Sequence, residues 1–148
     1  MLLTHRIEKD FVFAYKNKES EKVAVLRMLK AALKNRQVEL MKDLTDSEAL
    51  EVLIREVKQR QESIRQFIQA GRKDLSHKEQ EELKFIEPYL PLPLSSDEMR
   101  SIASEVIAEL GVADIKGMGL VMKTIAQRYP GRTDGRELSA IVREQLLL

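Results

Sequence analysis

Apolar residues recur along most of the chain at intervals of three and four residues, which is the spacing of one face of an α-helix. No segment alternates with a period of two for long enough to predict a strand. The apolar residues of the first three predicted helices are Ile7, Phe11 and Ala14, then Leu26, Leu29, Leu33 and Leu40, then Leu50, Leu53, Ile54, Val57 and Ile64. Gly71 is placed to end the third helix.

Helix starts are marked by three capping-box patterns, in which a hydroxyl side chain caps the helix and a glutamate three residues later bonds back to it. They occupy residues 45–48, 76–79 and 95–98. A short fourth helix is expected over residues 79–89, with a kink or a stop at Pro88.

Residues 88–94 contain three prolines within six positions, which predicts an extended path that no helix crosses. We therefore predict two small helical subdomains, a four-helix unit over residues 1–90 and a three-helix tail over residues 95–148. The apolar residues of the tail are Met99, Ile102, Ala103, Val106, Ile107 and Leu110, then Met118, Val121, Met122, Ile125, Ala126 and Tyr129, then Leu138, Ile141, Val142 and Leu146. The predicted fold class is all-α.

Composition agrees with a helical, globular chain. The 148 residues are 43% hydrophobic and contain only six glycines and four prolines, which favours an ordered helical core over disorder. The absence of cysteine excludes disulfides and thiolate chemistry and suits a reducing compartment. Neither a cleavable leader nor an apolar run of the roughly 20 residues that cross a bilayer is visible. We therefore expect a cytoplasmic protein without a membrane partner.

The segment 116–123, KGMGLVMK, poses the question of a glycine-rich phosphate loop. A dinucleotide site needs a buried strand before the glycines and a third glycine after them, and both are missing. Gly117 and Gly119 are instead expected to allow close packing where the sixth helix starts. His5 and His77 show no metal-ligand spacing. The sequence therefore predicts no catalytic residue, no cofactor and no metal site.

Positive charge is clustered although the formal net charge is only +1. Residues 22–42 hold six cations against one acid, residues 55–73 six against two, and residues 116–136 five against one. Such clusters suit RNA phosphates, and a solvated helix face with salt bridges is the open alternative. The glutamates of residues 79–87 are expected to form a solvated face.

Two groups of cations are candidate RNA-binding residues: Lys123, Arg128, Arg132 and Arg136 in the tail, and Lys58, Arg65 and Arg72 on a second surface. In the segment GRTDGR, Gly131 and Gly135 are expected to bring backbone amides near a phosphate. A plain turn between helices is the alternative. Few aromatic residues interleave with the cations, which argues against a stacking platform for single strands.

Three segments carry a family resemblance: EVKQRQESIRQFIQAGRKDL, EPYLPLPLS and IKGMGLVMKTIAQRYPGRTDGRELSAIVREQL. Their order and intervals resemble the YqeY-like family over nearly the whole chain. The resemblance implies an all-helical protein of two subdomains. It also implies that the tail is similar to a helical module in one subunit of the glutamine-dependent aspartyl/glutamyl-tRNA amidotransferase, where that module contacts tRNA.

The function implied by the resemblance is binding of tRNA or another structured RNA, without catalysis by this chain alone. Two alternatives stay open. One is a protein-interaction adaptor. The other is an accessory subunit in glutamine-dependent amide transfer, with amidotransferase or tRNA synthetase components as partners. The oligomeric state is left open.

Overall fold

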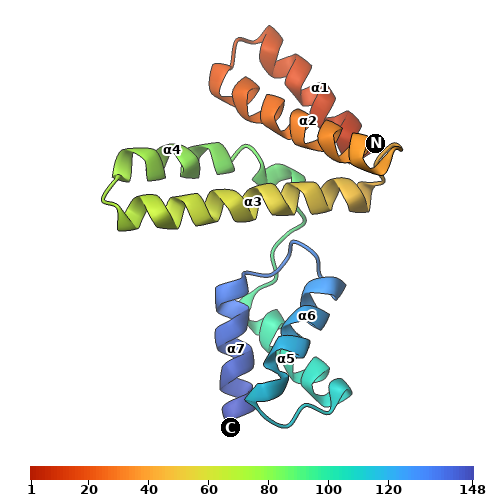
Figure 1. Ribbon diagram of the computed structural model, residues 1–148, viewed down its shortest axis with the longest axis vertical. Helices are drawn as coiled ribbons and strands as arrows, with labels where there is room; N and C mark the ends of the chain where they lie inside the picture. Colours follow the sequence, from red (N-terminus) through yellow and green to blue (C-terminus); the bar gives the residue numbers. More distant parts are fainter. The chain divides into compact units, whose positions relative to one another are not determined.

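The computed structural model describes residues 1–148 and contains only helices and connecting turns, which confirms the predicted all-α class (Figure 1). The elements are α1 (Leu3–Lys16), α2 (Ser20–Leu40), α3 (Asp46–Gln69), α4 (Lys73–Leu83), the 3₁₀ turn η1 (Glu87–Tyr89), α5 (Ser96–Leu110), the 3₁₀ turn η2 (Ile115–Gly117), α6 (Met118–Arg128) and α7 (Gly135–Leu147). Contacts divide the chain into two compact units, Met1–Leu90 and Pro91–Leu148.

In the N-terminal unit, α1 and α2 form a helical hairpin that packs on α3, and α4 folds back along α3 (Figure 1). The core is made largely by the apolar stripes that the sequence predicts, because apolar residues three and four positions apart share one face of a helix. Its fully buried side chains include Ile7 of α1, Leu26 and Leu29 of α2, and Leu53 of α3. The predicted apolar residues of α1 and α2 are thus confirmed as core, as are Leu53 and Val57 of α3. Leu50, Ile54 and Ile64 are only half-buried and lie outside the core cluster.

Two of the three predicted capping boxes are present. Thr45 Oγ1 accepts a hydrogen bond from the Glu48 amide at 3.2 Å, and Glu48 Oε1 accepts one from the Thr45 amide at 3.0 Å. Ser95 and Glu98 make the same reciprocal pair at the start of α5. Hydrogen bonds from Lys42 and then from the Thr45 backbone lower the pKa of Glu48 to about 2.

The predicted start of the fourth helix is wrong. Gly71, in the left-handed region with φ +72°, reverses the chain directly after α3, so that α4 begins at Lys73. Ser76 therefore lies inside the helix, buried, with its hydroxyl accepting a hydrogen bond from Gln80 Nε2 at 3.3 Å. The predicted end is wrong too, because α4 stops at Leu83.

No α-helix crosses the proline-rich segment, as predicted, but its first two residues lie in a 3₁₀ turn, and the extended path begins only at Leu90. Residues 87–89 form the turn η1, where Pro88 is tolerated because the first turn of a helix needs no N–H from it. Tyr89 is buried in the N-terminal unit and its hydroxyl donates to Asp10 Oδ2 at 2.5 Å. Burial first, and this bond second, raise the pKa of Tyr89. Leu94 is buried in the core of the C-terminal unit.

The C-terminal unit is a three-helix bundle whose core comes from the three predicted apolar stripes (Figure 1). Its buried side chains are Leu94, Met99, Ala103, Val106, Val121, Ile125, Leu138, Ile141, Val142 and Leu146. The structural unit begins at Pro91, whereas the sequence predicts a start at residue 95. The difference arises because the residues before α5 take part in this core.

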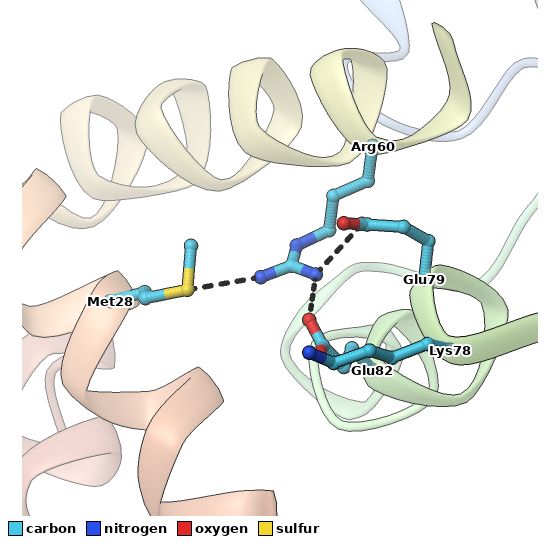
Figure 2. A network of polar contacts seen from close by, with 5 residues as sticks. All are labelled: Met28, Arg60, Lys78, Glu79 and Glu82. Carbon is cyan, nitrogen blue, oxygen red and sulfur yellow. Dashed lines mark hydrogen bonds and ion pairs between the residues drawn. The ribbon is translucent and has the colours of Figure 1, made fainter. Parts of the chain in front are cut away.

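A buried cation holds α4 on α3 (Figure 2). Arg60 of α3 is only 6% exposed, and its Nη1 donates to Glu79 Oε2 at 3.1 Å and to Glu82 Oε2 at 2.6 Å. Its Nη2 lies 3.5 Å from the Met28 sulfur of α2. Ser76 is the one fully buried residue of α4, and Leu83 packs against the core at its end, so the ionic contacts of Arg60 supplement a small apolar contact. The sequence predicts a solvated face for the glutamates of residues 79–87. This prediction is wrong for Glu79 and Glu82, which bond to Arg60.

We expect the fragment 1–90 to fold without the tail, because it has its own apolar core. Its circular dichroism should be strongly helical and its thermal unfolding cooperative. A fragment without helical dichroism would show that the two units fold only together.

Replacing Arg60 by methionine keeps the side-chain volume but leaves two partly buried carboxylates without their cation. We expect a loss of about 2–4 kcal/mol of unfolding free energy in urea titrations, slightly below the range for a fully buried pair. The matched control is Arg65→Met, whose pair with Glu62 is exposed and should contribute less than about 1 kcal/mol. Adding Glu79→Gln and Glu82→Gln to Arg60→Met should restore part of the loss. Equal effects of Arg60→Met and Arg65→Met would contradict the role of Arg60.

Candidate nucleic-acid interface

The turn between α6 and α7 brings Arg132 and Arg136 onto one short segment of the tail. Gly131 takes a left-handed conformation with φ +73°, as the reversal of the chain requires. Gly135 is instead the first residue of α7. The side chain of Asp134 caps that helix by accepting from the amides of Arg136 at 2.8 Å and Glu137 at 3.3 Å. Those two amides are already hydrogen bonded within the protein and are not free for a ligand. The expectation that Gly131 and Gly135 bring backbone amides near a phosphate stays a prediction.

Arg132 ties this turn to the segment before α5. Its Nε donates to the Leu92 carbonyl at 2.8 Å, and its own carbonyl accepts from the Leu94 amide at 2.7 Å. The guanidinium carbon lies 6.0 Å from the centre of the Tyr129 ring. The pKa of Glu98 is lowered chiefly by the Ser95 amide and also by the charge of Arg132. The half-buried guanidinium is thus fixed in place by Nε, and its two terminal nitrogens make no hydrogen bond within the protein.

The other tail cations differ in how far their charge is compensated. Arg128 turns to α5, where its Nη2 donates to Glu109 Oε2 at 2.7 Å. This bond lowers the pKa of Glu109 and raises that of Arg128. Lys123 on α6 and Arg136 at the start of α7 have exposed side chains that form no ion pair. The helices α6 and α7 pack together.

The second predicted surface consists of Lys58, Arg65 and Arg72, and neighbouring acids neutralise most of its positive charge. Arg65 bonds to Glu62 through Nε at 3.0 Å and through Nη2, and Arg72 bonds to Asp74 at 3.2 Å. The Arg72 pair raises the pKa of Arg72 and lowers that of Asp74. Lys58 is exposed and forms no ion pair. Arg72 also lies after the end of α3 at Gln69, so it does not share a helix with Lys58 and Arg65.

The segment KGMGLVMK forms η2 and the first turns of α6, with no strand before it. A Cβ on Gly117 would lie 2.3 Å from Val112 Cγ1, so this position requires glycine for close packing. Gly119 is exposed and has open space around it. The packing prediction therefore holds for Gly117 and is wrong for Gly119.

The sequence did not predict a group of aromatic and cationic residues on α1 and α2. The rings of Phe11 and Tyr15 are neighbours on α1, and Arg27 and Lys30 of α2 lie beside the Phe11 ring. The i, i+4 spacing of the two aromatic residues was a signal for the ring pair. Only the packing of α1 against α2 brings the cations to it.

No helix has both the length and the apolar composition that crossing a membrane requires. Acidic and histidine side chains nowhere gather in a group of three or more that could hold a metal ion.

Comparisons with known proteins agree on one family. The sequence profile of the YqeY-like proteins matches residues 4–146. Three curated relatives carry the name altered inheritance of mitochondria protein 41, mitochondrial. The protein of Candida glabrata is 31% identical over 108 residues, covering 70% of this chain and 59% of the relative. That of Eremothecium gossypii is 34% identical over 107 residues, covering 70% and 58%. That of Lachancea thermotolerans is 29% identical over 107 residues, covering 70% and 57%.

The chain thus spans less than two thirds of the length of these relatives. All three are named as mitochondrial proteins, and this finding contradicts the prediction of a cytoplasmic protein.

Replacing Arg132 by lysine should destabilise the tail, because lysine has no Nε–H group to reach the Leu92 carbonyl. We expect a loss of about 1.5–3 kcal/mol of unfolding free energy, the range for one hydrogen bond that involves a charged group. Arg136→Lys is the matched control, since that side chain makes no bond, and should leave the urea midpoint unchanged. Equal midpoints for both variants would show that the Arg132 bond does not contribute to stability.

Proposed function

Because this chain belongs to the YqeY-like family, we propose that it binds structured RNA, with tRNA as the first candidate, and does not catalyse a reaction by itself. The observation that carries the proposal is the turn between α6 and α7. There a guanidinium fixed by its bond to the Leu92 carbonyl stands four residues before the exposed Arg136. Fixing a cation before binding reduces the entropy lost when a phosphate docks.

The structure narrows the set of residues that we propose as phosphate contacts. A cation contributes most to the free energy of phosphate binding when no carboxylate already neutralises it. Its full charge can then replace counterions on the RNA. Lys123 and Arg136 meet this condition in the tail, whereas Arg128 is paired with Glu109. Arg132 forms no ion pair, although its charge acts on the Glu98 carboxylate. On the second surface only Lys58 meets it.

The resemblance of the tail to the tRNA-contacting module of the amidotransferase indicates the process to which the proposed RNA binding belongs. We infer that the chain accompanies tRNA-dependent amide transfer as a binding component, with catalysis in partner proteins. Since the curated relatives are named as mitochondrial proteins, mitochondrial tRNA is the first probe to test beside total tRNA.

A protein-interaction adaptor is the second candidate, and exposed apolar side chains of the tail favour it. Leu92 is 82% exposed and Leu120 is 53% exposed. Large apolar side chains in water are common at protein interfaces. An adaptor would use these side chains and not the cations, so that charge reversal in the tail would leave its binding intact.

The test is the double variant Lys123→Glu and Arg136→Glu, with Arg132 kept because it holds the turn. We expect tRNA binding in an electromobility series to weaken at least tenfold, and the slope of log K against log salt to fall by about two units, one per phosphate contact. The control is Lys9→Glu with Lys16→Glu, which makes the same charge change at two exposed, unpaired lysines of α1.

Unchanged affinity and slope in a folded tail variant would refute the tail contact. Absence of tRNA binding by the unmodified protein at low salt would refute RNA binding altogether.

A further inference from the structure

A cluster of aromatic and cationic side chains lies where α1 and α2 pack together. The ring centres of Phe11 and Tyr15 are 6.2 Å apart. The Lys30 Nζ lies 4.0 Å from the centre of the Phe11 ring, and the Arg27 guanidinium carbon lies 5.7 Å from it. Phe11 is partly buried against the core, while Tyr15 is 63% exposed. The cluster therefore presents an accessible ring beside fixed positive charge.

The cations continue as a row along α2. Arg27, Lys30 and Lys34 have the spacing i, i+3, i+7, which places them on one side of the helix over ~10 Å. Lys30 is paired with Glu8 of α1 at 2.8 Å. Arg27 and Lys34 are exposed and form no ion pair.

An open groove of about 400 Å³ extends from Lys30 along α2. Its polar lining is Thr4, Glu8, Lys30, Lys34 and Gln37, and its apolar lining includes Leu33 and Leu44. Lys30 and Lys34 of the row thus border a groove in which a chain could lie, and the Glu8 carboxylate in it is already paired with Lys30.

Aromatic rings with the unpaired Arg27 beside them, and the unpaired Lys34 further along α2, match the chemistry of single-stranded nucleic acid. Bases stack on an exposed ring, and the phosphates between them are met by lysine and arginine. In a duplex the bases are stacked inside the helix, so that the Tyr15 ring would add little. An acidic peptide could use the cations but would not need the ring.

We propose that this α1–α2 surface binds unpaired nucleotides of RNA, with one base stacked on Tyr15 and the flanking phosphates at Arg27 and Lys34. The proposal rests on the proposed RNA-binding function and adds to it a second contact of different chemistry, on the other unit of the chain. It departs from the expectation that aromatic residues are too sparse for a stacking surface, because α1 supplies the two rings and α2 the cations.

The test uses the full chain and fluorescence anisotropy with two probes, a 12-nucleotide oligouridylate and a 12-base-pair RNA duplex. Tyr15→Ala should weaken binding of the oligouridylate about 5- to 20-fold, the lower part of the range for losing one stacked base, and leave the duplex affinity unchanged. Phe13→Ala is the matched control, because Phe13 is equally exposed, at 64%, on the opposite side of α1. It should change neither affinity.

A second variant, Arg27→Gln with Lys34→Gln, tests the charges independently of the ring. It should lower the salt slope of oligouridylate binding by about 1.4 units, since each phosphate contact with a single strand contributes about 0.7. Circular dichroism checks that each variant is folded. Equal effects of Tyr15→Ala and Phe13→Ala, or an unchanged salt slope, would overturn the proposal. So would an oligoglutamate that displaces the oligouridylate at equal concentration, because the surface would then recognise charge alone.

The outcome separates this inference from the proposed function. If the unmodified protein binds tRNA and does not bind the oligouridylate, the α1–α2 site is refuted and the tail function stands. If it binds the oligouridylate through Tyr15 and the tail double variant binds tRNA normally, the tail contact is refuted and the α1–α2 site stands.

Discussion

The N-terminal unit depends on one buried guanidinium. Arg60 enters a site between α2, α3 and α4, where it meets two carboxylates of α4 and the sulfur of Met28 (Figure 2). Glu79 and Glu82 are three residues apart, so only one rotation of α4 presents both of them to Arg60. A buried charge is costly unless it is paired, and its Nε has no hydrogen-bond partner. The contact therefore does more to fix the position of α4 on α3 than to stabilise the folded unit.

An arginine also orders the tail, but through neutral oxygen atoms. Arg132 joins the turn after α6 to the residues before α5 by bonds at its side chain and its carbonyl. The same side chain is proposed to meet a phosphate, so folding and binding share one residue there. A proposed site built this way is ordered before the ligand arrives, and this reduces the entropy lost on binding.

The arginines of the chain differ in what the fold does with their charge. Arg60 is buried, Arg128 is exposed but bonded to Glu109, and Arg136 is exposed and unpaired. Counting cations along the sequence treats these three alike. The two proposed RNA contacts use only cations with uncompensated charge, and they differ in that the α1–α2 surface adds an aromatic ring.

The sequence by itself determined the helices, the core and two of the three capping boxes, because burial on a helix repeats every 3.6 residues and a capping box spans four. It failed at Ser76, since the reversal at Gly71 had already started α4. The tertiary structure alone decided which charges are paired between helices: Arg60 meets Glu79 across 19 residues, and Arg128 meets Glu109 across another 19. Ion pairs and ring contacts between helices depend on how the helices rotate and pack, which no local spacing encodes.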